Sequence, residues 1–214
     1  SHIEMGLVHV NGKIITEMGY QVKPTDEVKF DGSRVQQTPP AYLLLNKPKG
    51  FVATSQGGKI VKSVQDLIRS AVKTKVPPVG DMGRPMTGLL FFTNDEVLRK
   101  KLSNSKSIPM IYQVLLDKNV TSEMMKHLKE GQVVFEKKQK LNAISHMDGK
   151  SKKEVGIEVH SLSPAIIVKL FAAVGCKVVL LDRITYAGLT KKELPRGNWR
   201  RLNTKEIGFL KMLS

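Results

Sequence analysis

Short apolar runs and alternating apolar and polar positions divide most of this chain into strands separated by helices. Alternation is clearest over 155–159 and 183–186, where every second side chain is apolar, which is the spacing of a strand with one buried face. The pattern as a whole predicts strands over 42–46, 88–93, 110–116, 133–136, 141–146, 154–160, 177–181 and 183–187.

Capping residues mark where the helices between these strands begin. Ser63 precedes a segment whose apolar side chains fall on one helical face. Asn203, with Glu206 three residues later, has the spacing of a capping box. Strands interspersed with helices in this way predict an α+β domain. Further helices are predicted from 94–95, from 121–122 to 131, and from 164 to 175.

The first forty residues have a different character. The pattern of residues 6–34 predicts short strands joined by tight turns at Asn11-Gly12 and Asp31-Gly32. The polar composition and the prolines of segment 36–40 indicate a linker. We therefore predict a small N-terminal domain over 1–35, a linker over 36–40 and a main domain over 41–214.

Positive charge is concentrated in the main domain. Residues 1–40 carry 4 basic and 5 acidic side chains, whereas residues 41–214 carry 31 basic and 14 acidic side chains, a net charge of +17. Such a charge favours a polyanionic partner and salt-dependent binding. Two lysine-dense segments, 136–140 and 149–154, are interpreted as solvated hairpin ends rather than as specific contacts.

Other classes of protein find little support. The single Cys176 lies in an apolar context and cannot form an internal disulfide, which fits a reducing compartment. The longest apolar run, 165–174, is interrupted by Lys169 and is too short to span a bilayer. The histidines lack metal-ligand spacing, so no metal is assigned. We expect a cytoplasmic protein without a membrane partner.

Four segments carry a resemblance, in order and spacing, to one family. Residues 43–50 (LLLNKPKG), 79–95 (VGDMGRPMTGLLFFTND), 111–114 (IYQV) and 191–202 (KKELPRGNWRRL) follow one another along the main domain. Together they closely resemble the ribosomal-RNA pseudouridine synthases of the RsuA type. In that family the second segment reads V-G-R-L-D-x-x-T-x-G-L-L-L-L-T-N-D.

The resemblance implies a fold and a partner. The fold would be the pseudouridine-synthase α+β fold, a mixed, mostly antiparallel sheet with flanking helices and a central cleft. Residues 1–35 would be the second half of a small RNA-binding domain that precedes it in these enzymes. The partner would be structured RNA, with ribosomal RNA as the expected class, and the family uses no cofactor and no metal.

The same resemblance points to a missing nucleophile. The family's aspartate attacks the target uridine, and a carboxylate suits that step because it is ionised at neutral pH. A gap-free alignment places Gly83 at this aspartate, and glycine has no side chain with which to attack. Asp81 lies two residues earlier, about 6.5 Å away in an extended segment, and would need a remodelled loop to substitute.

A second departure concerns the family's basic residue that pairs with the aspartate. Anchoring the register on Phe171 places Val168 at that position. Both halves of a buried ion pair would then be absent together. Removing only the acid would leave a buried cation at a cost of about 3–5 kcal/mol, whereas replacing both with apolar groups can be neutral. We therefore expect an apolar cleft floor.

Several residues remain candidates for contact with substrate or RNA. Tyr112 would lie near the target base, with a core strand aromatic as the alternative interpretation. Lys47 and Arg84 are the other substrate-binding candidates. Residues 99–101 could equally form the solvated face of a helix. The candidates for RNA binding are Arg99, Lys100, Lys101, Arg183, Arg196, Arg200 and Arg201.

Three hypotheses follow. The first is an RNA-binding family member that is catalytically impaired or inactive because Gly83 replaces the nucleophile. The second is an active uridine-to-pseudouridine isomerase that uses Asp81. The third is a protein-interaction module that has lost RNA binding, which would show an apolar cleft and scattered basic residues.

Overall fold

The computed structural model describes residues 1–23, 25–35, 38–53 and 62–213. The chain forms two compact units, Ser1–Pro39 and Pro40–Ser214. No helix in the described part of the chain is long and apolar enough to cross a membrane.

The first unit is a small antiparallel sheet with strand order β2-β1-β3-β4. Asn11-Gly12 and Asp31-Gly32 form its tight turns, and all four of these residues have positive φ, as such turns require. Among its described residues only Val10 is a buried hydrophobic residue, so the unit has little core of its own. Its strands are β1 (Val8–Val10), β2 (Lys13–Ile14), β3 (Val28–Phe30) and β4 (Ser33–Arg34).

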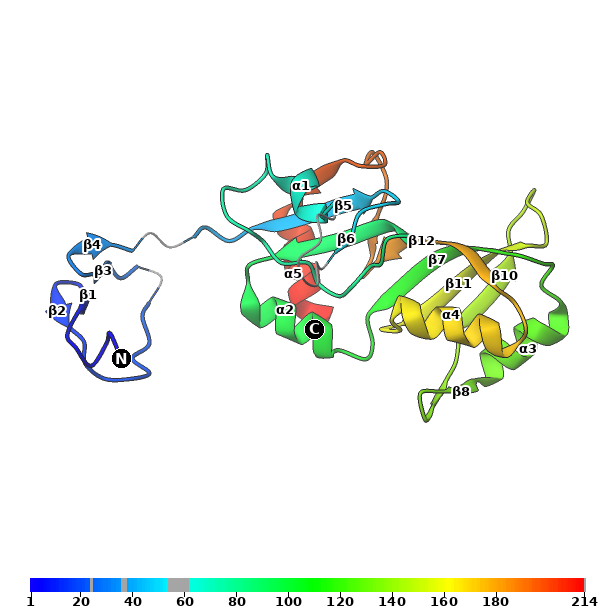
Figure 1. Cartoon of the computed structure of the whole chain (residues 1–214), viewed down its shortest axis with the longest axis horizontal. Helices are drawn as coiled ribbons and strands as arrows, with labels where there is room; N and C mark the ends of the chain where they lie inside the picture. The colour runs from blue at the N-terminus through cyan, green and yellow to red at the C-terminus, as the bar shows by residue number, and fades with distance from the viewer. Residues whose placement is uncertain (24, 36–37, 54–61, 214) are drawn as a thin grey trace. The chain divides into compact units, whose positions relative to one another are not determined.

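The second unit is built on a mixed sheet with strand order β10-β11-β7-β12-β6-β5-β14 and a short β13 paired with β12 (Figure 1). The pairing of β12 with β6 is parallel, and the other pairings in this sheet are antiparallel. The predicted mixed, mostly antiparallel sheet is thus confirmed. Its strands are β5 (Tyr42–Lys47), β6 (Thr87–Thr93), β7 (Pro109–Leu116), β10 (Ala143–His146), β11 (Glu154–His160), β12 (Val178–Tyr186), β13 (Leu189–Thr190) and β14 (Trp199–Arg201).

Helices lie on both faces of this sheet. Successive residues of β5 and β6 face opposite sides, so Leu44 and Phe91 belong to the larger core with α2, α3, α4 and α5, whereas Leu45 and Phe92 pack with α1. In Figure 1, α3 and α4 lie at the end of the sheet with β10 and β11. The helices are α1 (Val64–Ile68), α2 (Glu96–Asn104), α3 (Ser122–Glu130), α4 (Pro164–Ala173) and α5 (Thr204–Leu213).

The predicted helix caps are present. The Ser63 hydroxyl accepts a hydrogen bond from the Gln65 backbone, and the Asp66 carboxylate accepts one from the Ser63 backbone, which forms a capping box. Asn203 and Glu206 exchange reciprocal hydrogen bonds of 2.9 Å at the start of α5. These local signals therefore place the helix starts correctly.

Three strand predictions were wrong in detail. The predicted strands 177–181 and 183–187 are one strand, β12, interrupted by register shifts rather than by a turn. The predicted strand 133–136 extends into a turn, since Phe135 and Glu136 have positive φ between β8 (Gln132–Val134) and β9 (Lys137–Gln139). The lysine-rich segment after this turn forms β9, which pairs with β8. The short strands β13 and β14 were not predicted.

Candidate functional site

The segment from Val79 to Met86 forms a loop that leads into β6 and lines one side of a cavity of about 340 Å³. Main-chain hydrogen bonds fix it from two sides. The Val79 backbone donates to the Phe91 carbonyl at 2.8 Å, and the Gly50 backbone donates to the Arg84 carbonyl at 2.9 Å. The loop is therefore held by β6 and by the segment that follows β5.

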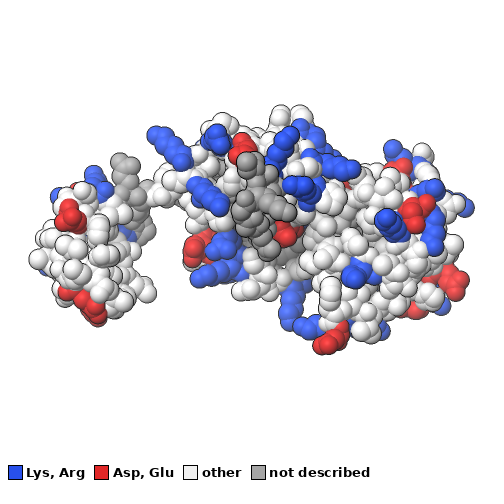
Figure 2. Space-filling model, in the orientation of Figure 1, with Lys and Arg blue, Asp and Glu red and all other residues white. Residues whose placement is uncertain are grey.

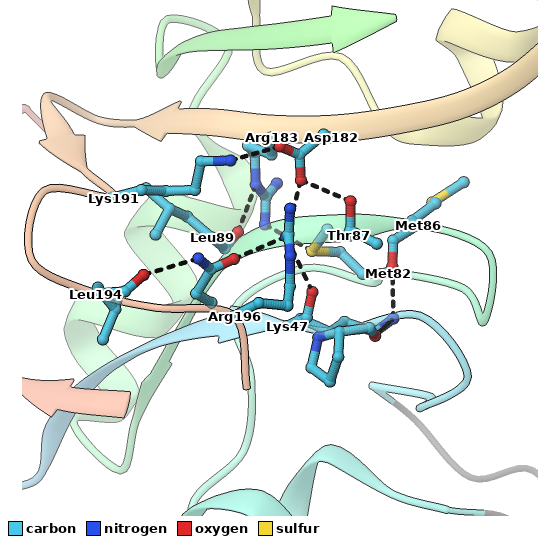
Figure 3. Close-up of polar contacts among 12 residues, drawn as sticks. Lys47, Met82, Met86, Thr87, Leu89, Asp182, Arg183, Lys191, Leu194 and Arg196 are labelled. Atoms are coloured by element: carbon cyan, nitrogen blue, oxygen red, sulfur yellow. Dashed lines mark hydrogen bonds and ion pairs between the residues drawn. The ribbon is translucent and has the colours of Figure 1, made fainter. Parts of the chain in front are cut away.

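Lys47, at the end of β5, is the strongest of these anchors. Its side chain is fully buried, and Nζ donates to the carbonyls of Met86 at 2.7 Å, Gly83 at 3.0 Å and Pro48 at 3.3 Å. Burial lowers the pKa of Lys47 to about 8, while the nearby charge of Asp81 raises it. Lys47 thus holds the loop in shape through these contacts (Figure 3). It is not one of the residues that line the cavity.

Gly83 lies on the cavity wall, at the place where the family resemblance puts the nucleophile. Its φ is not in the left-handed region, and an added Cβ would meet only the Pro85 side chain, at 3.7 Å. Neither backbone strain nor crowding therefore requires glycine here. The loop has kept the space for a side chain at a position that lacks one.

Arg183, on β12, reaches the cavity from the interior. It is 3% exposed, and Nε donates to the Leu89 carbonyl at 2.7 Å. Nη1 lies 3.3 Å from the Tyr112 hydroxyl, and Nη2 lies 3.4 Å from Met82 Sδ. The guanidinium also lies 4.9 Å from the ring centroid of Tyr186, a cation–π contact.

This placement bears on the predicted site. An apolar floor was expected, but the cavity keeps a buried cation in Arg183. Arg183 was a candidate for RNA binding, and it is buried against Leu89 and Tyr112 while bordering the cavity. Tyr112 itself is 1% exposed and is absent from the cavity wall, which matches the core interpretation of this residue.

The neighbouring Asp182 connects three distant segments (Figure 3). Its carboxylate accepts hydrogen bonds from Thr87 at 2.6 Å and Arg196 at 2.9 Å, and it forms an ion pair with Lys191. Burial raises the pKa of Asp182, but hydrogen bonds from these three partners outweigh it and leave the pKa below its ordinary value of 3.8.

Sequence reasoning missed this connection. Arg196, an expected RNA contact, also donates to Asn46 Oδ1 at 2.7 Å, so its guanidinium ties the segment after β13 to β5. The signal in the sequence was the charged pair Asp182-Arg183 in the middle of an apolar strand.

Asp81 lies on the cavity wall, whereas Val168 does not. Asp81 is an exposed residue on the cavity wall, and it is the only acidic residue among the described residues that form this wall. Val168 lies on the exposed face of α4 and does not line the cavity, which α4 borders only through Pro164 and Ala165 at its first turn.

The remaining basic candidates come from several elements. Arg84 is exposed in the loop, and Lys100 is exposed on α2 beside Arg99 and Lys101. Figure 2 shows Lys and Arg side chains over much of one face of this unit, interspersed with a few acidic residues. On β14, Arg200 forms a bidentate ion pair with Glu206, and Arg201 donates to the Ala71 carbonyl. The predicted RNA-binding residues thus belong to α2, β12, β14 and the segment after β13.

Among the described residues no three His, Cys, Asp or Glu side chains are grouped so that they could hold a metal ion. The polar side-chain groups of the residues that border the cavity are one guanidinium, one exposed carboxylate, the Tyr186 hydroxyl and several serine hydroxyls. The set has no second carboxylate and no histidine among the described residues, so it offers no acid–base pair of the usual kind.

Comparisons with known proteins agree with this fold. A family model for RNA pseudouridylate synthase matches residues 41–167. Ribosomal large subunit pseudouridine synthase B of Bacillus subtilis (strain 168) is 30% identical over 216 residues, covering 99% of this chain and 88% of the relative. An uncharacterized RNA pseudouridine synthase of Aquifex aeolicus (strain VF5) is 32% identical over 214 residues, covering 99% and 88%.

A crystal structure of a pseudouridylate synthase has a TM-score of 0.72 with this chain at 23% identity, covering 98% of this chain and 90% of that one. The fold is therefore that of the pseudouridine synthases. With the family match and the relatives, this establishes that the chain belongs to the RNA pseudouridylate synthase family, among its RsuA-type members.

Proposed function

We propose that this chain is an RNA-binding member of the family that has lost the isomerisation of uridine. The observation that carries the proposal is Gly83: the loop around it is anchored as described, and the position of the nucleophile has no side chain. The expected partner is structured RNA, most specifically ribosomal RNA. Residues 1–35 are proposed to be part of a small RNA-binding domain, joined to the main domain through 36–40.

The state of the cavity supports loss of chemistry rather than loss of the site. Lys47 still donates to the Gly83 carbonyl, and a Cβ at residue 83 would have room. A collapsed cavity would have filled that space with neighbouring side chains. The binding surface can therefore persist without the reaction.

Binding to RNA is supported by charge and by the relatives. Residues 41–214 carry a net charge of +17, which favours a polyanion and predicts a steep dependence on salt. The similar proteins from Bacillus subtilis and Aquifex aeolicus are named as a ribosomal large subunit pseudouridine synthase and an RNA pseudouridine synthase. Arg84 and Lys100 are the exposed cations proposed to contact phosphates.

One observation favours the alternative, an active isomerase that uses Asp81. Asp81 borders the same cavity as Arg183, and its charge raises the pKa of the buried Lys47. However, a displacement of about 1 Å can already reduce a rate on the order of a hundredfold. Asp81 precedes the nucleophile position by two residues, so we favour the hypothesis that the chain does not isomerise uridine.

The test of RNA binding uses the whole chain and fragments of ribosomal RNA in a salt series. Binding that weakens linearly with the logarithm of salt concentration, and that favours structured fragments over a single-stranded homopolymer, is the expected result. Absence of salt-dependent binding to any fragment would refute the proposal and favour the protein-interaction hypothesis.

A further inference from the structure

Arg183 has more hydrogen-bond donors than its surroundings accept. A guanidinium carries five N–H groups. Its oxygen acceptors among the described residues are the Leu89 carbonyl at 2.7 Å and the Tyr112 hydroxyl at 3.3 Å. The other hydrogen-bond contacts are the thioether sulfurs of Met82 and Met110, at 3.4 and 3.7 Å, which are weak acceptors. The guanidinium also lies 4.9 Å and 5.9 Å from the ring centroids of Tyr186 and Tyr112, neither of which supplies a counter-ion.

The charge of Arg183 is also unbalanced. Within the described part of the chain, no carboxylate forms an ion pair with it. Its neighbour Asp182 is already bound to Lys191 and Arg196. A buried cation without a counter-ion is costly, and a protein relieves that cost by pairing the cation. The cavity is the open side from which an anion could approach.

Other groups on the cavity wall suit an anion. Ser161 Oγ accepts from the Ile108 backbone at 2.9 Å, and Ser163 Oγ accepts from the Ile166 backbone at 3.4 Å. Neither hydroxyl donates a hydrogen bond to another described residue, so both protons can be directed at a ligand. The first turn of α4, at Ala165, adds the partial positive charge of a helix N-terminus.

We propose that the cavity formed by Arg183, Ser161, Ser163 and the first turn of α4 binds a phosphate-type oxyanion. The shared chemistry is a tetrahedral oxyanion, supplied either by the RNA backbone or by a free phosphate group. The volume of about 340 Å³ lies within the range of small-ligand sites, roughly 300–1,000 Å³. The inference goes beyond the proposed function because it depends on the geometry of the cavity, not on RNA.

Two substitutions on α4 test the site without touching its buried core. Ala165→Asp places a carboxylate at the exposed first turn of α4. The helix dipole stabilises a negative charge there, so the helix should be retained, but the carboxylate repels an anion in the cavity. Ala172→Asp makes the same charge change at an exposed position near the other end of α4, away from the cavity. Asp81→Asn removes the carboxylate from the cavity wall, and Arg183→Met removes the cation.

The measurement is titration calorimetry of the whole chain with inorganic phosphate at constant ionic strength. We expect saturable binding that Ala165→Asp weakens about tenfold, that Ala172→Asp leaves unchanged, and that Asp81→Asn strengthens. Arg183→Met should abolish it, with circular dichroism reporting whether that variant folds. Non-saturable heats in the wild type, or equal affinities for the Ala165→Asp and Ala172→Asp variants, would overturn the proposal.

A competition experiment separates the two sources of the anion. If inorganic phosphate at constant ionic strength displaces bound RNA from the wild type but not from Ala165→Asp, the anion is an RNA phosphate. If phosphate binds saturably and RNA binding is unaffected or absent, the site takes a free phosphate. Both results support the oxyanion site, and only the first also supports the proposed function at this cavity.

Discussion

Gly88 lies directly against the backbone of Arg183. A Cβ on residue 88 would stand 2.2 Å from the Arg183 carbonyl oxygen and 2.5 Å from its backbone nitrogen, and Gly88 has a φ of +103°. Here β6 and β12 run parallel, with Asp182 opposite Thr87 and Arg183 opposite Gly88. This close approach sets the guanidinium of Arg183 beneath the loop that contains Gly83.

Gly88→Ala should therefore be strongly destabilising. The methyl group would clash with backbone rather than with a movable side chain, and the positive φ adds strain, so we expect a loss of about 3 kcal/mol or more in the free energy of unfolding. Gly156→Ala is the matched control, because a Cβ there meets nothing within 4 Å; it should be neutral or stabilise by up to about 1 kcal/mol. Urea unfolding of both variants is the measurement, and similar midpoints would contradict the account.

Asp182→Asn should loosen the segment between β13 and β14. The amide nitrogen would face donors where the carboxylate now accepts, leaving Lys191 and Arg196 without their counter-ion, and we expect a loss of about 2–4 kcal/mol. Glu96→Gln, which removes an exposed partner of Lys100, should change stability by less than about 1 kcal/mol. Equal effects of the two changes in chemical denaturation would show that the Asp182 contacts add nothing.

The same carboxylate predicts a dependence on acid. The folded-state pKa of Asp182 is below 3.8, so its stabilisation is fully present above that value and is lost as pH falls through the folded-state pKa. Wild type should therefore lose stability below about pH 4 more steeply than Asp182→Asn, with unfolding followed by fluorescence. Parallel curves for the two proteins would contradict this assignment.

Lys47 predicts a second rise of stability with pH, in the alkaline range. Its pKa is about 8 in the folded state and 10.5 ordinarily, so between these values the unfolded chain binds the additional proton and stability rises with pH. The difference in unfolding free energy between wild type and Lys47→Met should grow by up to about 1.4 kcal/mol per pH unit over this range. A difference that is constant from pH 7 to 10 would rule out a lowered pKa.

The RNA surface is tested by removing single exposed cations. Arg84→Gln and Lys100→Gln should each weaken RNA binding and reduce the slope of log K against log salt by about one. Lys150→Gln, in the segment interpreted as a solvated hairpin end, serves as the control and should leave the slope unchanged. If Lys150→Gln lowers RNA affinity more than Arg84→Gln and Lys100→Gln do, RNA binds at the end of the sheet formed by β10 and β11.

Local signals made much of the fold predictable. Caps at Ser63 and Asn203 place two helix starts, and period-two alternation places β11, because these patterns depend on neighbours in the sequence. The turn at Phe135 and Glu136 was missed because neither residue is typical of positive φ. The segment of β12 was predicted as two strands separated at Asp182, whereas the structure has one strand with register shifts, which depend on its pairing with β7 and not on neighbours in the sequence.

The site was less predictable because its contacts are long-range. The hydrogen bond from Thr87 to Asp182 joins residues 95 positions apart, and no local pattern reveals it. The motif around Gly83 correctly located the cavity. The cation of that cavity, Arg183, is placed there by the parallel pairing of β6 with β12. A single sequence does not specify such a long-range pairing, so it could not show that the cation comes from β12 and not from α4.

The most direct measurement is conversion of uridine to pseudouridine in unmodified ribosomal RNA by the wild-type chain, read by mass spectrometry beside the Bacillus subtilis relative as positive control. We expect RNA binding with no pseudouridine from this chain, because residue 83 offers no carboxylate. Conversion by the wild type that disappears in Asp81→Asn would contradict the account and make Asp81 the nucleophile.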